Sequence, residues 1–265
     1  MNIPLTLSFF LLSTLLFGQQ YNGVVIEKAR VDKNNLIYKD GRSFVYRVAI
    51  KTEGTSSYIL SMGAEAYELT DQRDEAQVTE VRLSVMKPRL FKRTNTNQTE
   101  ICYSYEPQPT FTSNTGLVEN EVNCWLHPPR NGFFAALQTC PYPYVKHNRP
   151  AGYTWMDSMS IANHWADSSW GTWQGRLLLS YDYRISGTET LRTEFGEIPC
   201  TVVEATASSA AGRSTLVAHF TEEYGFVQLD YRLFNGTEVK LSLVRVDAGP
   251  SIRDAKDFFE SREAH

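Results

Sequence analysis

Alternation of apolar and polar residues dominates the stretch from 176 to 246, and it is the strongest constraint on the fold. Val227, Leu229 and Tyr231 alternate with polar residues, and the stretch from 237 to 244 repeats the pattern. Successive side chains of a strand point to opposite faces, so this period of two indicates one buried and one wet face. We therefore predict an antiparallel meander of consecutive strands. Its segments are 176–185, 200–206, 216–220, 226–233 and 237–244.

The turn between the last two segments contains Asn235-Gly236, a strong signal for a tight hairpin. A two-residue loop would place apolar residues opposite charged residues, because a shift of one residue moves every side chain to the other face. A three-residue loop, 234–236, places Tyr231 opposite Val239 and keeps one face apolar. Gly236 then takes the left-handed position of a bulge, which glycine adopts without steric cost. We predict the three-residue loop.

The first half of the chain also predicts strands and no helical layer. The segment 43–51 is amphipathic, with Phe44 and Tyr46 on the expected inner face. No run of helical period separates the strands, which argues against an alternating β/α architecture. We predict a mostly β fold: a curved antiparallel sheet, half-barrel or sandwich-like, with a long aromatic-rich loop region. The other predicted strands are 24–31, 58–61, 67–70, 78–85 and 101–105.

The N-terminal residues predict export. An apolar run at 5–17 is shorter than the ~20 residues of a membrane-spanning helix and suits a secretory signal. We expect a signal peptide at 1–18, with cleavage near Gly18-Gln19, and a periplasmic or secreted protein that does not span the membrane. A buried N-terminal helix is the alternative.

The rest of the chain is predicted as a single β-rich domain at 19–247 and a tail at 248–265. The domain is divided into N-terminal strands at 19–118, an aromatic loop region at 119–175 and the C-terminal meander at 176–247. A short helix is expected at 131–138 and another in the tail, at 254–263.

Composition and motifs exclude several classes of function. The net charge is −4 and no basic stripe is present, so we predict no nucleic-acid partner. The chain contains no phosphate loop, dinucleotide fingerprint or nucleophile elbow. No close cysteine or histidine pair has the spacing of zinc ligands. We therefore predict no cofactor, no metal and no catalytic residue.

Four cysteines, an even number in an exported chain, favour disulfides. They permit three pairings: Cys102 and Cys124 flank a turn-rich stretch, so we predict that pair. Buried free thiols are the alternative. The other two cysteines are Cys140 and Cys200.

The aromatic middle region carries the candidates for ligand contact. It holds all five tryptophans, and long ordered loops of this kind are often functional. It is as often a cover that fills the open side of a sheet. The candidate ligand-binding residues are Trp125, His127, Arg130, Trp155, Trp165, Trp170 and Trp173.

The histidines have simpler interpretations. His127 and Arg130 lie in a Pro-Pro frame, but catalysis requires a partner within hydrogen-bond reach and no nearby residue supplies one, so a structural role is favoured. His164 lies beside Trp165, where packing is favoured over ligand contact. His219 lies beside Val217 on a predicted strand and is interpreted as a sheet-face residue.

Several short motifs resemble an uncharacterised group of exported bacterial proteins, the TapB-like family. The motifs are 123–130, 141–146, 152–155, 195–200 and 223–227. The resemblance covers the second half of the chain, roughly 119–246. It implies a curved antiparallel sheet, distantly similar to the half-barrel carriers of lipoproteins and lipids. It supplies no catalytic residues. No lipidated cysteine lies near the cleavage point, so the resemblance does not extend to a membrane anchor.

Three functional hypotheses follow. The first is a non-enzymatic exported protein that binds a hydrophobic or lipid-like ligand, or an envelope protein, in its concave sheet. The second is a structural or scaffolding envelope protein without a small-molecule ligand. The third is a hydrolase that uses His127 or His164. A large apolar cavity supports the first, a filled interior the second, and an acid or nucleophile facing either histidine the third.

Overall fold

The structure of the chain is a computed structural model that describes residues 21–61, 67–75, 77–89, 93, 95–107 and 115–263. Strands dominate it. They are β1 (Arg42–Thr52), β2 (Thr55–Ser61), β3 (Tyr67–Thr70), β4 (Glu80–Val85), β5 (Thr99–Glu106), β6 (Thr115–Glu119), β7 (Asn123–Leu126), β8 (Tyr144–Lys146), β9 (Thr154–Ala162), β10 (Arg176–Thr193), β11 (Gly196–Ser209), β12 (Gly212–Thr221), β13 (Gly225–Arg232) and β14 (Glu238–Ala248). The helical elements are η1 (Lys28–Arg30), η3 (Gly132–Thr139), η4 (Asn163–Trp165) and α1 (Ala255–Glu263).

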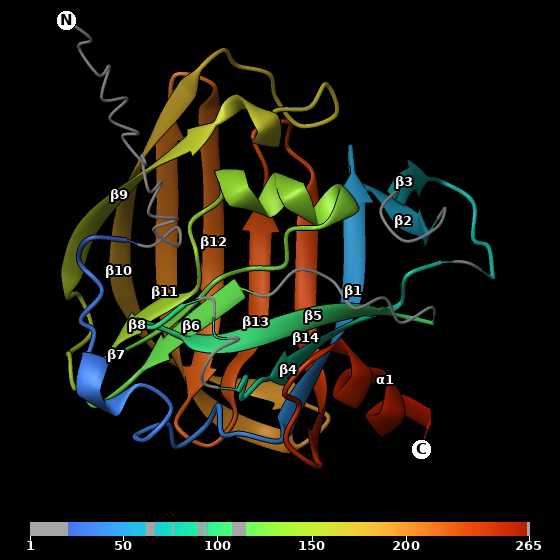
Figure 1. Cartoon of the computed structure of the whole chain (residues 1–265). Coiled ribbons are helices and arrows are strands. Elements are labelled where there is room, and N and C mark those ends of the chain that lie inside the picture. The colour runs from blue at the N-terminus through green and yellow to red at the C-terminus, as the bar shows by residue number, and fades with distance from the viewer. Residues whose placement is uncertain are drawn as a thin grey trace, which may run out of the picture.

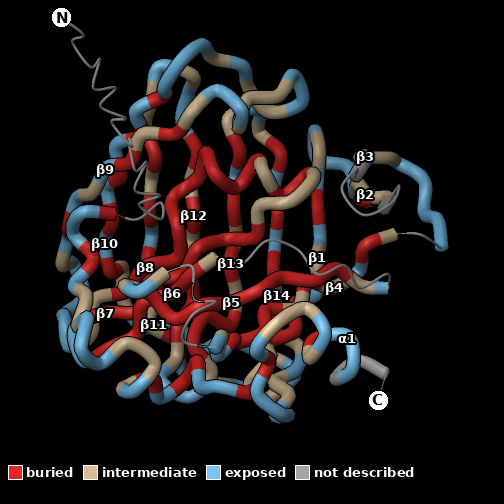
Figure 2. Tube along the Cα trace, in the orientation of Figure 1, coloured by how far each residue is buried: buried red, intermediate tan, exposed pale blue. Residues whose placement is uncertain are grey.

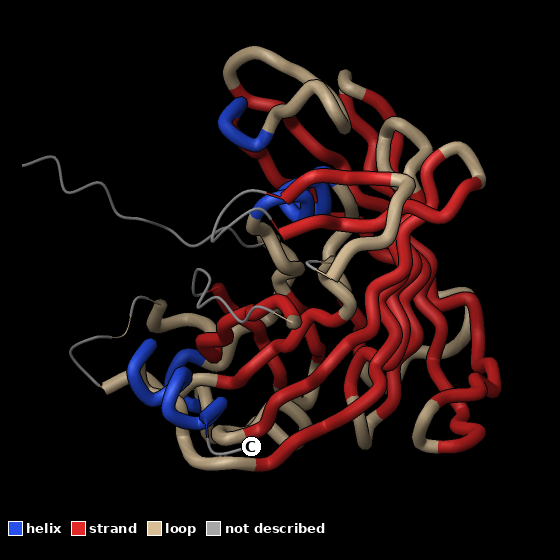
Figure 3. The backbone as a smooth tube through the Cα atoms, turned by 90° about the vertical axis from the view of Figure 1, so that its right-hand side faces the viewer, coloured by secondary structure: helices blue, strands red, loops and turns tan. Residues whose placement is uncertain are grey.

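The strands of both halves of the chain belong to one curled sheet. Its order is β8–β7–β6–β5–β4–β1–β14–β13–β12–β11–β10–β9, and β2 and β3 branch off at β1. The strands β5–β8 cross in front of the upright strands β9–β14, and a view from the side shows the two layers (Figures 1 and 3). The fold is therefore the expected half-barrel. The sequential strands β8 and β9 form its two ends.

β1 is the strand at which the sheet turns from one layer to the other. It pairs with β14 along most of its length and with β4 over Ser43–Arg47. A bulge at Val45 and Tyr46 interrupts the ladder with β14, and bulges bend and twist a strand. Phe44 and Tyr46 are buried and Arg47 is exposed, as the alternation of the sequence predicts.

One hydrophobic core fills the space between the layers. The buried parts of the chain run through the centre of the molecule, where the inner faces of β5–β8 meet those of β10–β13 (Figure 2). The helical element η3 lies in this space, with Phe133, Phe134 and Leu137 buried. Within the described residues, no helix is long and apolar enough to cross a membrane.

The meander and its last turn agree with the sequence. β10 to β14 are five antiparallel strands, and Tyr231 pairs with Val239. The amide of Gly236 donates to the carbonyl of Leu233, which leaves 234–236 as a three-residue loop. Gly236 has a φ of 84° and Asn235 is not left-handed. The alternation of apolar residues therefore predicted the register of β13 and β14 correctly, with a three-residue loop in place of the two-residue turn.

Two predictions of local structure are wrong. The segment 24–31 is no strand: it contains η1 and turns, and side chains of the front layer satisfy its backbone. Asn123 accepts from the amide of Val25, and Asn120 donates to its carbonyl. The aromatic middle is less irregular than expected, because it contributes β7, β8 and β9. The predicted short helix at 131–138 is the 3-10 helix η3.

The predicted Cys102–Cys124 disulfide is also wrong. All four cysteines are buried free thiols. Cys102 packs with Met86, Ile252 and Phe258 in a small cluster beneath the C-terminal segment, whereas Cys124 lies in the main core. The two residues flank a turn-rich stretch in the sequence, but their side chains belong to separate clusters. Their closeness in the sequence therefore did not indicate closeness of the two side chains in the fold.

We predict that Gly236→Ala lowers the free energy of unfolding by about 1 kcal/mol, because an L side chain is strained at positive φ. Space does not limit the substitution, since the nearest atom to an added Cβ would be Arg232 Nη2 at 3.9 Å. Gly249→Ala is the control, because a Cβ there meets nothing within 4 Å and φ is not positive. Equal denaturant midpoints for the two variants would contradict the assigned turn.

Candidate functional site

Tyr21 is enclosed by aromatic rings from both layers of the half-barrel, on the side where the two ends of the sheet meet. Its ring is fully buried and stacks on Tyr181 of β10 at 4.5 Å and on Tyr142 at 5.3 Å, measured between centroids. Its hydroxyl accepts from the amide of Tyr142 at 2.8 Å and from the hydroxyl of Tyr183 at 3.2 Å. Stacked aromatic pairs of this kind contribute beyond the area that they bury. Tyr21 thus joins the back layer to the segment that follows η3.

Trp125 and His127 belong to this same cluster. The Trp125 ring meets Tyr21 edge-on at 5.8 Å, and the His127 ring lies 4.8 Å from Tyr142. Both side chains are almost completely buried. Arg130 is only partly buried, and its charge acts on both His127 and Tyr142. Three of the candidate residues are therefore brought together in the interior.

Trp155 lies at the end of the cluster where the two ends of the sheet meet. Its ring stacks on Tyr183 at 5.0 Å with the planes 8° apart, and it meets Tyr144 of β8 edge-on at 5.4 Å. Lys146 Nζ lies 5.7 Å from the Trp155 ring centroid, within range of a cation–π contact. This tryptophan therefore packs β9 against β8.

Trp165, Trp170 and Trp173 do not join the buried cluster. They lie in η4 and the loop after it, and they are half-buried against the edge of the core. Trp170 Nε1 donates to the carbonyl of Trp165 at 3.0 Å. The side chain of Asn235 donates to the carbonyl of Ser169 at 2.6 Å, which ties this loop to the β13–β14 turn. The seven predicted residues thus form two separate groups, and their role in binding a ligand stays a prediction.

The segment that carries Tyr21 is held in place by polar side chains of the front layer. Glu119 accepts from the amides of Leu36, Ile37 and Tyr38 at 2.6–2.9 Å. Three such bonds satisfy the acceptor oxygens of a side chain that is otherwise costly to bury. Tyr144 Oη donates to the carbonyl of Gly23 at 2.8 Å. These contacts fix the segment 21–41 over the open side of the half-barrel.

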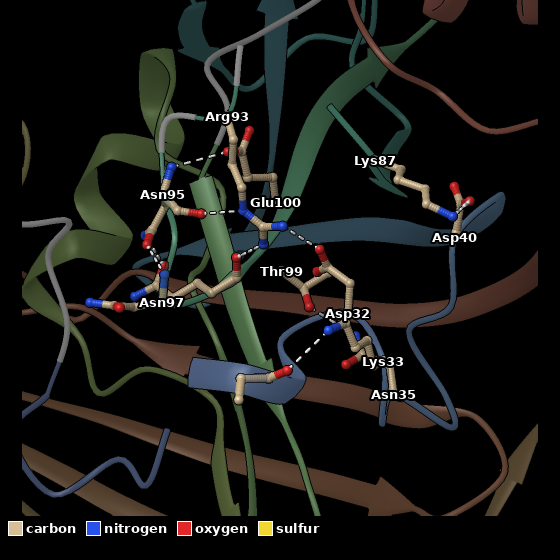
Figure 4. Close-up of polar contacts among 12 residues, drawn as sticks. Asp32, Lys33, Asn35, Asp40, Lys87, Arg93, Asn95, Asn97, Thr99 and Glu100 are labelled. Carbon is tan, nitrogen blue, oxygen red and sulfur yellow. Dashed lines mark hydrogen bonds and ion pairs between the residues drawn. The ribbon is translucent and has the colours of Figure 1, made fainter. Parts of the chain in front are cut away.

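A second set of contacts lies at the β5 end of the same segment, as Figure 4 shows. Arg93 forms an ion pair with Asp32 and donates to the carbonyl of Gln98 at 2.8 Å. Asn35 donates to the hydroxyl of Thr99 at 3.0 Å. These contacts join the segment that carries Asp32 and Asn35 to Arg93 and to Thr99 of β5.

The electrostatics of the interior oppose acid–base catalysis by His127. Burial and the nearby Arg130 lower the pKa of His127 to about 3, so its ring is neutral at neutral pH. Its Nδ1 faces the carbonyl of Pro128 at 3.0 Å. Burial also raises the pKa of Tyr21, Tyr142 and Tyr183 well above the ordinary value. His164 is exposed, and its ring contacts Trp165.

Sequence reasoning missed the residue at the centre of the cluster. Tyr21 is an isolated tyrosine beside the predicted cleavage point, and no periodicity marks it as buried. Tyr181 and Tyr183 occupy alternate positions of the predicted strand 176–185, and both are buried. The sequence signal for a partner of Tyr21 is the Pro141–Tyr144 motif, whose two tyrosines are fully buried.

Comparisons with known proteins give only distant likenesses. No protein-family model matches the chain, and no curated protein matches it. A protein proposed to be exported, with a YmcC-like fold, from Bacteroides fragilis is 10% identical over 80% of this chain and 97% of its own, with a TM-score of 0.46. A protein proposed to be a lipoprotein, from Parabacteroides distasonis, is 12% identical over the same shares of the two chains, with a TM-score of 0.45.

A third solved structure, the hypothetical lipoprotein YmcC from Escherichia coli, is 13% identical over 77% of this chain and 83% of its own, with a TM-score of 0.33. We draw no function from likenesses of this degree. The TapB-like resemblance, which no family model supports, stays a prediction.

We predict that Tyr21→Ala lowers the free energy of unfolding by about 3–5 kcal/mol, the cost of emptying a buried aromatic site. The apolar cavity left behind should bind p-cresol, as engineered cavities bind small aromatic molecules. Thermal unfolding with and without p-cresol measures both effects. Met156→Ala is the control, because Met156 is 73% exposed. A Tyr21→Ala melting temperature close to that of the control would contradict the central position of this ring.

We predict a stability loss in acid from His127. The pKa of this group is about 3 when folded and near 6.5 when unfolded, so the unfolded chain binds more protons between these values. The contribution of His127 to the free energy of unfolding is complete above its pKa in the unfolded chain. This contribution is lost as the pH falls towards 3.

Between about pH 7 and about pH 4.5 the loss is about 2–3 kcal/mol. Urea unfolding of His127→Gln should lack this part of the pH dependence, while His164→Gln should keep it. The same slope in both variants would show that His127 is accessible to protons in the folded state.

Proposed function

We propose that this protein is an exported, non-enzymatic domain of the cell envelope whose interior is filled by its own side chains and whose partners bind its outer surface. The observation that carries the proposal is the stack of Tyr21 between Tyr142 and Tyr181, which occupies the concave side where a carrier would hold its cargo. The apolar N-terminal run, 5–17, supports export. Among the three hypotheses, a filled interior favours the structural or scaffolding one.

The chemistry around the histidines supports a binding role over hydrolysis. His127 is almost completely buried and is surrounded by the rings of Trp125 and Tyr142. A general base must reach the proton that it abstracts, and a ring with a pKa of about 3 is a weak base at neutral pH. His164 contacts a tryptophan ring on the surface.

A second candidate function is the binding of a small polar molecule around Tyr142. Three buried atoms close to this tyrosine have no hydrogen-bond partner: His127 Nε2, Gln138 Nε2 and Tyr231 Oη. Gln138 accepts from the Tyr142 hydroxyl at 2.6 Å, the His127 ring lies 4.8 Å from the Tyr142 ring, and Tyr231 raises the pKa of Tyr142. Buried polar groups are normally paired, so such a cluster favours a polar partner, a water molecule or a solute.

Native mass spectrometry of the mature chain, made in an exporting host and purified without detergent, tests the proposal. We expect a mass equal to the chain without its signal peptide and no lipid after solvent extraction. An extractable lipid bound at one per chain would contradict the filled interior. A small polar adduct that is lost in the Tyr142→Phe variant would favour the second candidate. The mass should be unchanged by a reducing agent, because the cysteines are free thiols.

A further inference from the structure

The hairpin of β10 and β11 extends beyond its partner strands and forms a groove on the outer face of the sheet. β9 pairs with β10 only up to Arg184, and a bulge between Ile185 and Gly187 follows. The remainder of β10, residues 187–193, is called the β10 extension here. It pairs with β11 alone. Its tip reaches β1, where Glu194 forms an ion pair with Arg47 at 3.1 Å.

Two hollows lie along this groove and adjoin one another. The first has a volume of about 400 Å³ and the second about 440 Å³, and both are lined by Leu191 and Gln228. The first lies over β12, where His219 lines it, and the second lies over β14, where Ser242 lines it. The groove is therefore elongated, and it crosses several strands.

The first hollow carries negative charge and a buried histidine. Glu189 and Glu204 line it, and its lining includes no lysine or arginine. His219 is 5% exposed, and its Nε2 lies 3.5 Å from Glu189 Oε2. His219 Nδ1 is buried and has no hydrogen-bond partner. Arg184 is directly opposite Glu204 in the ladder, outside the lining of the hollow.

The chemistry of these groups selects a cationic donor. Glu189 and Glu204 present two carboxylates to the hollow, and no lysine or arginine lines it with them. An ammonium or guanidinium group supplies the hydrogens and the positive charge that such a pair of carboxylates accepts. Metal binding is not indicated, since no group of three or more metal-ligating side chains comes together within the described residues.

The edge of the β10 extension adds a second kind of contact. Along 187–193 the described residues provide a strand partner on the β11 side only. A strand edge of this kind presents backbone donors and acceptors to which an extended chain can pair. A polypeptide that lies in the groove can thus combine backbone pairing with one basic side chain in the first hollow.

We propose that this groove binds an extended segment of a partner protein and that a lysine or arginine of that segment enters the first hollow, between the carboxylates of Glu189 and Glu204. The inference deepens the proposed function, because it names a place on the outer surface and the chemistry of the partner. It does not depend on what fills the interior, so a lipid found by mass spectrometry would leave it standing.

The test uses fluorescently labelled peptides of about nine residues, the length of a long strand, and the mature protein. One peptide alternates threonine and valine around a central lysine, and its match carries norleucine in place of the lysine. Fluorescence anisotropy should show at least tenfold weaker binding for the norleucine peptide, as expected when a charge-assisted hydrogen bond is lost. N-methylation of the lysine peptide on its pairing edge should weaken binding by a similar factor.

Variants of the protein locate the site. Glu189→Gln and His219→Phe should each weaken binding of the lysine peptide about tenfold. Glu197→Gln is the matched control, because Glu197 is exposed on β11 and lines neither hollow. Circular dichroism confirms that each variant is folded.

Three outcomes would overturn the proposal: no binding of the lysine peptide at about millimolar concentration, the weak end of measurable affinity; equal binding of the two peptides; or unchanged binding by both variants. Spermidine that competes as strongly as the lysine peptide would also overturn it, because the site would then be one for free amines.

Discussion

The fold depends on the stacking of Tyr21 against rings from both layers of the half-barrel. A curled sheet with one open side cannot bury its concave face by itself, and η3 and the segment 21–41 supply the missing apolar surface. Tyr21 contacts Tyr181 of the back layer and Trp125 of the front layer, so a single ring connects the two. Removing it would leave a cavity between strands that are far apart in the sequence.

Polar contacts around this core determine where the covering segment lies. Glu119 binds three consecutive amides of the segment, and Asn120 and Asn123 bind its backbone near Val25. These groups replace the strand ladder that the segment lacks, since buried backbone groups need partners. Such hydrogen bonds add little net stability, but they select one position for the segment. A buried backbone group left without a hydrogen-bond partner would cost free energy. These contacts hold the segment 21–41 against the core that contains Tyr21.

Much of the fold could be predicted because its strands are amphipathic. Alternation located β1 and the meander, and the same pattern decided the three-residue turn at Gly236. The site was less predictable. Four of the seven candidate residues lie in one region, Trp125, His127, Arg130 and Trp155, while Trp165, Trp170 and Trp173 lie in another. The burial of Tyr21 and the separation of Cys102 from Cys124 are set by contacts between segments that are distant in the sequence. The local alternation of apolar and polar residues carries no information about such contacts. His219 was correctly predicted to lie on a sheet face. Its contact with Glu189 could not be predicted, because it depends on the register between strands.

The most direct test of this account is a crystal structure of the mature protein purified without detergent. The account predicts that the Tyr21 ring lies between Tyr142 and Tyr181, with its hydroxyl bonded to the Tyr142 amide. Density for an acyl chain or another apolar molecule in that place, with Tyr21 displaced to the surface, would contradict the filled interior and favour a carrier.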